Sequence, residues 1–120
     1  MITALVVEDS ITDREILTEY LRRSGVAVTS AGSSEEALIM LQSTHPDVVF
    51  LDVVLPGQSG FEFCHSLKTD KSTQDIPIVI CSTKGTDADK LWGSMLGADA
   101  YLAKPLTQQA IAQAVAQLGQ

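Results

Sequence analysis

The sequence predicts an α/β fold, a doubly wound parallel sheet of five strands with five helices, in a single domain over residues 1–120. Short aliphatic runs alternate with stretches of helical periodicity along the whole chain, and this alternation is typical of parallel strands joined by right-handed helical crossovers. The aliphatic runs are about five residues long, which is the length of an ordinary strand. A chain of 120 residues is long enough to bury one hydrophobic core.

The first strand is predicted at Thr3 to Val7, because this run is almost wholly apolar, as in a strand that is covered on both faces. A helix follows, and Thr12 with Glu15 three residues later is typical of a capping box at its start. Its apolar face is marked by Ile16, Leu17, Tyr20 and Leu21. Gly25 is expected to end the helix, since glycine is common just past a helix C-terminus.

The second strand, Val26 to Ala31, is less apolar than the first. A second capping box, formed by Ser33 and Glu36, indicates the start of the second helix. The apolar face of that helix carries Ala37, Leu38 and Leu41. Pro46 and Asp47 then turn the chain into Val48 to Asp52, which has the strongest pattern of a buried strand.

The second half of the chain repeats this alternation. Ser59 is expected to cap a third helix, because serine is a favoured N-cap residue. That helix carries Phe61, Cys64 and Leu67 on its apolar face. The remaining elements are a strand from Ile78 to Cys81, a helix around Leu91 to Leu96 that ends at Gly97, a strand from Ala100 to Ala103, and a helix from about Thr107 to Leu118.

Composition excludes several classes of function. The net charge is −7 and the pI is near 4.5, which disfavours binding to nucleic acid or to anionic lipid. No apolar run approaches the roughly 18 residues that a membrane span needs. Cys64 and Cys81 lack the spacing of a metal or redox pair. We therefore expect a cytoplasmic protein that contacts neither nucleic acid nor membrane.

The candidate site lies where the strands end, because ligands of such sheets bind at the carboxyl ends of the strands. The polar residues that follow four of the strands are Glu8, Asp9, Asp52, Ser82 and Lys104. Three carboxylates in one crevice repel one another unless a cation lies between them, and an all-oxygen site with few protein ligands suits Mg²⁺. A hydroxyl and an ammonium suit phosphoryl oxygens, so the set fits phosphoryl transfer to a carboxylate.

These residues resemble the full motif set of response-regulator receiver domains. The resemblance includes the segment Leu-Asp-Val-Val-Leu-Pro-Gly-Gln-Ser-Gly around Asp52 and the Lys104-Pro105 pair, and it spans essentially the whole chain. It implies a flavodoxin-like sheet with strand order 2-1-3-4-5. It also implies that Asp52 is the phosphoacceptor, and that Mg²⁺ is held by Glu8, Asp9, Asp52 and the backbone carbonyl of Val54.

The same resemblance implies roles for other residues and for partners. Ser82 and Lys104 would hold the phosphoryl oxygens, Tyr101 would swing inward together with Ser82, and the Lys104-Pro105 bond would be cis. Val54 and Lys84 would flank the path of an attacking water. The phosphoryl donor would be a histidine kinase or a histidine phosphotransfer protein, and the chain would be a signalling protein rather than an enzyme.

Each site residue also has a plainer interpretation. Asp52 alone could be a turn residue, and the acidic pair before the first helix can also cap that helix. Thr83 rather than Ser82 could supply the hydroxyl, and Tyr101 in a short strand could simply pack against its neighbours. The presence of suitable residues at four strand ends together favours the phosphoryl-transfer site.

Three other classes of protein remain to be compared. A flavin carrier of the same architecture would need a glycine- and hydroxyl-rich anion loop where this chain has Glu8 and Asp9. A P-loop nucleotide enzyme would need a G-x-x-x-x-G-K-[ST] segment, which the sequence lacks. The third class is a degenerate receiver that binds other proteins without being phosphorylated, and the complete motif set argues against it.

Such a receiver would signal either by docking to another protein or by passing its phosphoryl group to a second histidine protein. We expect no output domain, because the predicted fifth helix ends with the chain. The stretch from Ser82 to Gly85 together with 87–96 resembles stand-alone receivers of twitching-motility systems, which implies a downstream motility or signalling protein as partner. Lys90, Trp92 and Tyr101 are candidates for the docking face on the fourth helix, fifth strand and fifth helix, although the spacing of Trp92 would also suit a core position.

Overall fold

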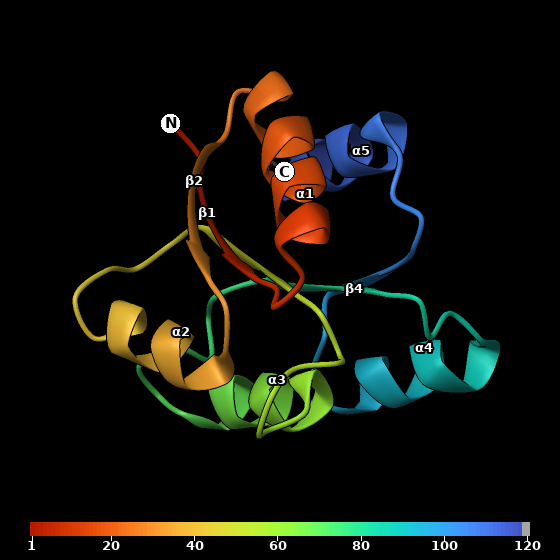
Figure 1. Cartoon of the computed structure of the whole chain (residues 1–120). Helices are drawn as coiled ribbons and strands as arrows, with labels where there is room; N and C mark the ends of the chain where they lie inside the picture. The colour runs from red at the N-terminus through yellow and green to blue at the C-terminus, as the bar shows by residue number, and fades with distance from the viewer. Residues whose placement is uncertain (119–120) are drawn as a thin grey trace.

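Five parallel strands form one sheet in the order β2-β1-β3-β4-β5 (Figure 1). The computed structural model describes residues 1–118, so the last two residues of the predicted domain, 119 and 120, lie outside the described residues. The strands are β1 (Thr3–Val7), β2 (Ala27–Ala31), β3 (Val48–Leu51), β4 (Ile78–Ser82) and β5 (Ala100–Ala103). The helices are α1 (Ile11–Arg23), α2 (Ser34–Leu41), α3 (Gly60–Thr69), α4 (Asp87–Met95) and α5 (Gln108–Leu118). The predicted fold class and strand order are confirmed.

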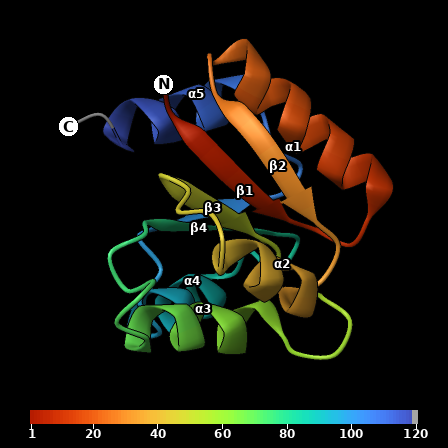
Figure 2. The ribbon, with the colours of Figure 1, turned by 90° about the vertical axis from the view of Figure 1, so that its left-hand side faces the viewer.

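Helices cover both faces of the sheet, as Figure 2 shows, with α1 and α5 on one face and α2, α3 and α4 on the other. Each face has its own buried cluster: Phe63 and Leu67 belong to one, Leu21 and Ile111 to the other. The strands β1, β3 and β4 are buried, whereas the edge strands β2 and β5 are only partly buried. The edge position explains why the second aliphatic run is the less apolar one. Within residues 1–118, no helix has the length and apolar character needed to cross a membrane.

The start of α1 corrects the predicted capping box of Thr12 and Glu15. Ser10 is the N-cap, and its hydroxyl accepts a hydrogen bond from the backbone N–H of Asp13 at 3.3 Å. Ser10 supplies the same capping oxygen as a threonine would and lies closer to the end of β1, so the helix gains two residues at its start. Asp13 is therefore in the first turn of α1, which bears on the site described below.

Two other helix starts also differ in detail from the sequence pattern. Ser33 caps α2 as predicted, but the carboxylate of Glu36 accepts from the backbone N–H of Gly32 rather than from that of Ser33. A full reciprocal capping box forms instead at α4, between Thr86 and Asp89. The fourth helix therefore begins at Asp87, four residues before the predicted start.

Candidate functional site

Strand register brings the predicted acidic residues to one edge of the sheet. Val7 of β1 is paired with Leu51 of β3, so Glu8 and Asp52 leave their strands at the same level. The backbone N–H of Lys104, just past β5, donates to the carbonyl of Ser82 at the end of β4. Because the strands are parallel, all of these residues lie at the carboxyl end of the sheet.

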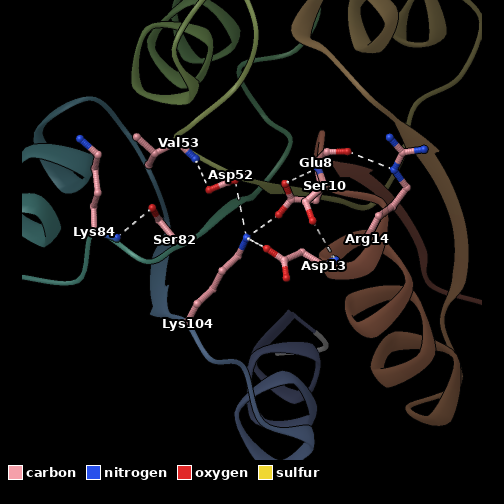
Figure 3. Close-up of polar contacts among 9 residues, drawn as sticks. All are labelled: Glu8, Ser10, Asp13, Arg14, Asp52, Val53, Ser82, Lys84 and Lys104. Carbon is pink, nitrogen blue, oxygen red and sulfur yellow. Dashed lines mark hydrogen bonds and ion pairs between the residues drawn. The ribbon is translucent and has the colours of Figure 1, made fainter.

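The ammonium of Lys104 is the centre of the site (Figure 3). Its Nζ atom lies 2.5 Å from Glu8 Oε1, 2.8 Å from Asp13 Oδ2 and 3.6 Å from Asp52 Oδ2. The side chains of Lys104, Glu8 and Asp52 are only 10%, 5% and 11% exposed. One buried cation is thus shared among three carboxylates, which lie just past β1, in the first turn of α1 and just past β3.

Burial and the contacts within this cluster shift the pKa values of Glu8 and Lys104. Burial raises the pKa of Glu8, the hydrogen bond from Lys104 opposes that shift, and the charge of Asp52 adds to it. Burial alone would lower the pKa of Lys104, but hydrogen bonds to Asp13 and Glu8 and the charge of Asp52 raise that pKa above its usual value. Lys104 is therefore charged, and it partly offsets the cost of holding Glu8 out of water.

The backbone around Asp52 is fixed on both sides. Its N–H donates to the carbonyl of Val7 at 3.0 Å, and its Oδ1 accepts from the N–H of Val53 at 2.7 Å. A Cβ atom on Gly60, the first residue of α3, would lie 2.0 Å from the Asp52 carbonyl oxygen. Glycine is therefore required there, and it lets α3 pack directly against the backbone that carries the candidate acceptor.

The predicted switch residues are joined through the backbone of Lys84. Its N–H donates to the hydroxyl oxygen of Ser82 at 3.1 Å, and its carbonyl accepts a hydrogen bond from the hydroxyl of Tyr101. Ser82 is fully buried at the end of β4, whereas Thr83 is exposed, so burial favours Ser82 as the site hydroxyl. The ring of Tyr101 lies 6.4 Å from that of Phe61, centroid to centroid. The Lys104-Pro105 bond is cis, as the resemblance implied.

The predicted metal ligands are only partly gathered. Within residues 1–118, no three Asp, Glu, His or Cys side chains are arranged to hold a metal ion. Asp9 is exposed, and so is the side chain of Val54. Glu8 and Asp52 do converge, but on the ammonium of Lys104. The donors are all oxygen atoms and two of them already share a cation, so the residues fit Mg²⁺ in kind, with Lys104 as the competing cation.

Sequence reasoning missed two residues of this site. Asp13 contributes the third carboxylate around Lys104, and the Nε of Arg14 donates to the backbone carbonyl of Glu8 at 3.0 Å. The available signal was Ser10: a serine directly after the acidic pair can start the helix, which places Asp13 in the first turn and facing the strand ends. The preference for Thr12 as the cap concealed that arrangement.

Comparison with known proteins gives one consistent family. Residues 4–116 match the family model described as response regulator receiver domain. The protein PilH of Pseudomonas aeruginosa is 35% identical over 115 residues, which cover 96% of this chain and 95% of PilH. The phosphate regulon transcriptional regulatory protein PhoB of the same species is 36% identical over 105 residues, which cover 88% of this chain and 46% of PhoB. In structure, the chemotaxis response regulator CheY4 of Vibrio cholerae superposes with a TM-score of 0.90 at 29% identity, with 98% of both chains covered.

Proposed function

The chain belongs to the response-regulator receiver domain family, and on this premise we propose that Asp52 accepts a phosphoryl group from a histidine of a histidine kinase or a histidine phosphotransfer protein. A phosphoacceptor role is general to this family of signalling modules. The single observation that most supports Asp52 is its place: a buried carboxylate at the strand ends, 3.6 Å from the ammonium of Lys104.

The transfer uses the carboxylate of Asp52 as the nucleophile. One of its oxygens forms a bond to phosphorus while the bond from phosphorus to the partner's histidine nitrogen breaks, which leaves an acyl phosphate on Asp52 and a free imidazole on the partner. Such a transfer depends mainly on positioning and on neutralising charge on the phosphoryl oxygens. Lys104 already lies close enough to Asp52 to contribute that charge.

Receiver domains generally bind Mg²⁺ where they are phosphorylated. In this chain Glu8, Asp9, Asp52 and the backbone carbonyl of Val54 would hold it, and the ion would supply further neutralisation of the phosphoryl oxygens. Glu8 already holds Lys104, so a divalent cation on Glu8 would compete with the ammonium for the same carboxylate. Lys104 would then be free to donate to a phosphoryl oxygen on Asp52.

The output is proposed to pass through α4, β5 and α5. A rotation of Ser82 toward a phosphoryl group would move the hydroxyl oxygen that accepts from the N–H of Lys84, and the carbonyl of Lys84 also accepts from the hydroxyl of Tyr101. This shared backbone couples the two switch residues to the loop before α4. Trp92 on α4 is 49% exposed and so belongs to the surface rather than to the core. A downstream motility or signalling protein would read this face.

We also infer that residues 1–120 form a single receiver domain that acts in the cytoplasm. Both cysteines, Cys64 and Cys81, are free and buried. Burial raises their pKa values to about 11 and about 12, so they remain unreactive thiols. Free thiols agree with a reducing compartment.

Phosphorylation of the purified protein tests the proposal. The protein is incubated with Mg²⁺ and acetyl phosphate, and the modified residue is located by mass spectrometry; we expect an acid-stable, base-labile phosphate on Asp52. Asp52→Asn should remain unlabelled, because an amide cannot become an acyl phosphate. Asp47 lies just before β3, at the other end of the sheet, and accepts from the N–H of Thr3; the matched change Asp47→Asn should be labelled like the wild type. Labelling of Asp52→Asn would show that the acceptor is another residue, and absence of label on the wild type would favour a degenerate receiver.

A further inference from the structure

Asp13 is the member of the site that the family motifs do not explain. It lies in the first turn of α1, and its backbone N–H is bonded to the hydroxyl of the N-cap Ser10. Its carboxylate reaches Lys104 across 91 residues of sequence, with Oδ2 at 2.8 Å from Nζ. The helix start therefore fixes a carboxylate on the α1 side of the buried ammonium, as Figure 3 shows.

We propose that Asp13 is a positioning residue that holds the ammonium of Lys104 toward α1 and thereby sets how readily Lys104 passes to a phosphoryl group on Asp52. This inference rests on the proposed function, since it assumes that Asp52 is the acceptor. Lys104 has three N–H donors. In the described structure the two short contacts go to Glu8 and Asp13, and Asp52 is the most distant of the three carboxylates.

The exposures of the partners suggest which contact can be exchanged. The side chain of Glu8 is 5% exposed, whereas that of Asp13 is 40% exposed. A carboxylate that water can reach loses less when its partner leaves than a buried one does. Asp13 is therefore the partner that Lys104 can exchange for a phosphoryl oxygen, and it competes with that oxygen as long as it is charged.

Asp13 weakens the binding of a phosphoryl group, but it should strengthen the binding of a divalent cation. An ion on Glu8 takes that carboxylate from Lys104, and Asp13 remains as a partner for the displaced ammonium. Without Asp13, Lys104 would depend on Glu8 more strongly and the ion would compete less well. Asp13 thus favours the cation and disfavours the phosphoryl group, and a residue that only stabilises the fold would not act on the two ligands in opposite directions.

Asp13→Asn tests this pair of effects. Binding of Mg²⁺ alone, and of beryllofluoride at saturating Mg²⁺, is followed by calorimetry and by the backbone amide shifts of Asp52 and Val53. Relative to the wild type, we expect Mg²⁺ affinity to fall and beryllofluoride affinity to rise, each by about fivefold, the upper range of a partly exposed ion pair. Asp13→Glu keeps the charge and should bind both ligands like the wild type.

Two controls separate the contact from the charge alone. Glu15→Gln removes one exposed carboxylate from the same helix and should change neither affinity. In a Lys104→Met background, Asp13→Asn should no longer alter Mg²⁺ affinity; an undiminished effect there would overturn the proposal, because it would act without Lys104. Unchanged affinities in Asp13→Asn would overturn this inference alone. A wild-type protein that binds neither ligand would overturn the proposed function as well.

Discussion

At the amino ends of the strands, carboxylates have fixed partners, whereas at the carboxyl ends three carboxylates share one ammonium. Asp47, just before β3, accepts from the backbone N–H of Thr3 at 2.8 Å, and Asp99, just before β5, accepts from the N–H of Ile78 at 2.8 Å. Thr3 and Ile78 are the first residues of β1 and β4. Each of these two aspartates therefore caps the neighbouring strand.

The difference separates structural from functional use of the same side chain. The capping carboxylates accept hydrogen bonds from backbone N–H groups that would otherwise lack a partner, and strand register fixes which N–H each carboxylate meets. Glu8 and Asp52 are buried around Lys104, so two carboxylates face a single ammonium. A buried cluster in which carboxylates outnumber the cation is costly to the fold, and clusters of this kind are candidates for functional sites.

The largest difference between the two ends is expected when the lysine at each end is removed. Lys104→Met leaves Glu8 and Asp52 buried without a cation and should cost about 3 kcal/mol of unfolding free energy. Lys68→Met removes the cation from the partly exposed Asp99 and should cost about 1 kcal/mol. Urea unfolding measures both.

Magnesium distinguishes these two variants further. Mg²⁺ should stabilise Lys104→Met more than the wild type, because no ammonium competes for Glu8, and tenfold excess over the dissociation constant corresponds to about 1.4 kcal/mol. Lys68→Met should respond to Mg²⁺ as the wild type does, at matched ionic strength. Equal losses in the two variants, with equal responses to Mg²⁺, would contradict the distinction between the two ends.

Loss of a strand cap should affect stability without affecting the site. Asp99→Ala leaves the partly buried N–H of Ile78 without its acceptor and should lower the unfolding free energy by about 1–2 kcal/mol. Labelling by acetyl phosphate should continue at the wild-type rate. A change in labelling rate in a variant that remains folded would mean that the two ends of the sheet are coupled.

A substitution at the exposed rim of the site should change the lifetime of the phosphoryl group without changing stability. The side chain of Val54 is 58% exposed and offers no hydrogen bond to orient a water. Val54→Asn should speed loss of the phosphoryl group by about tenfold, equivalent to about 1.4 kcal/mol of barrier. Stability should be unchanged. The decay of phosphorylated protein, followed by mass, measures the rate, and an unaltered lifetime would exclude Val54 from the path of water.

The smallest expected effect is a dependence on pH at the amino end. Hydrogen bonds from the backbone and the hydroxyl of Thr3 hold the pKa of Asp47 below its ordinary value of 3.8. Stability from this group is therefore present above that value and is lost as the pH falls through the lower, folded-state pKa. Asp47→Asn should flatten the acid limb of an unfolding curve below pH 3.8; an acid limb identical to that of the wild type would contradict the assignment.

The sequence was sufficient for the sheet because each strand has a local signal. Hydrophobicity alone predicts strands at Thr3 to Val7, Val48 to Asp52 and Ile78 to Cys81, each within one residue of the observed strand, and their alternation with helices predicts a parallel sheet. Parallel strands then bring Glu8, Asp52 and Lys104 to one edge. That part of the site could be predicted, because strand order and direction decide it.

The remaining features depend on contacts that no local pattern encodes. The bond between Asp47 and Thr3 joins residues 44 apart, and the one between Asp99 and Ile78 depends on the register of neighbouring strands. Asp13 was missed because its role requires the helix to start at Ser10, and two capping residues lie within three positions there. The Thr86–Asp89 box is an exception, because its three-residue spacing is a local signal for a helix start.

Amide shifts at both ends of the sheet test the central claim most directly. The ¹⁵N-labelled protein is titrated with Mg²⁺ and then with beryllofluoride. The account predicts large shifts for the amides of Glu8, Asp52 and Lys104, and little change for those of Thr3 and Ile78, whose partners are fixed. Shifts of equal size at the two ends, or none at Asp52, would contradict the claim that the shared ammonium marks the ligand-binding end of the sheet.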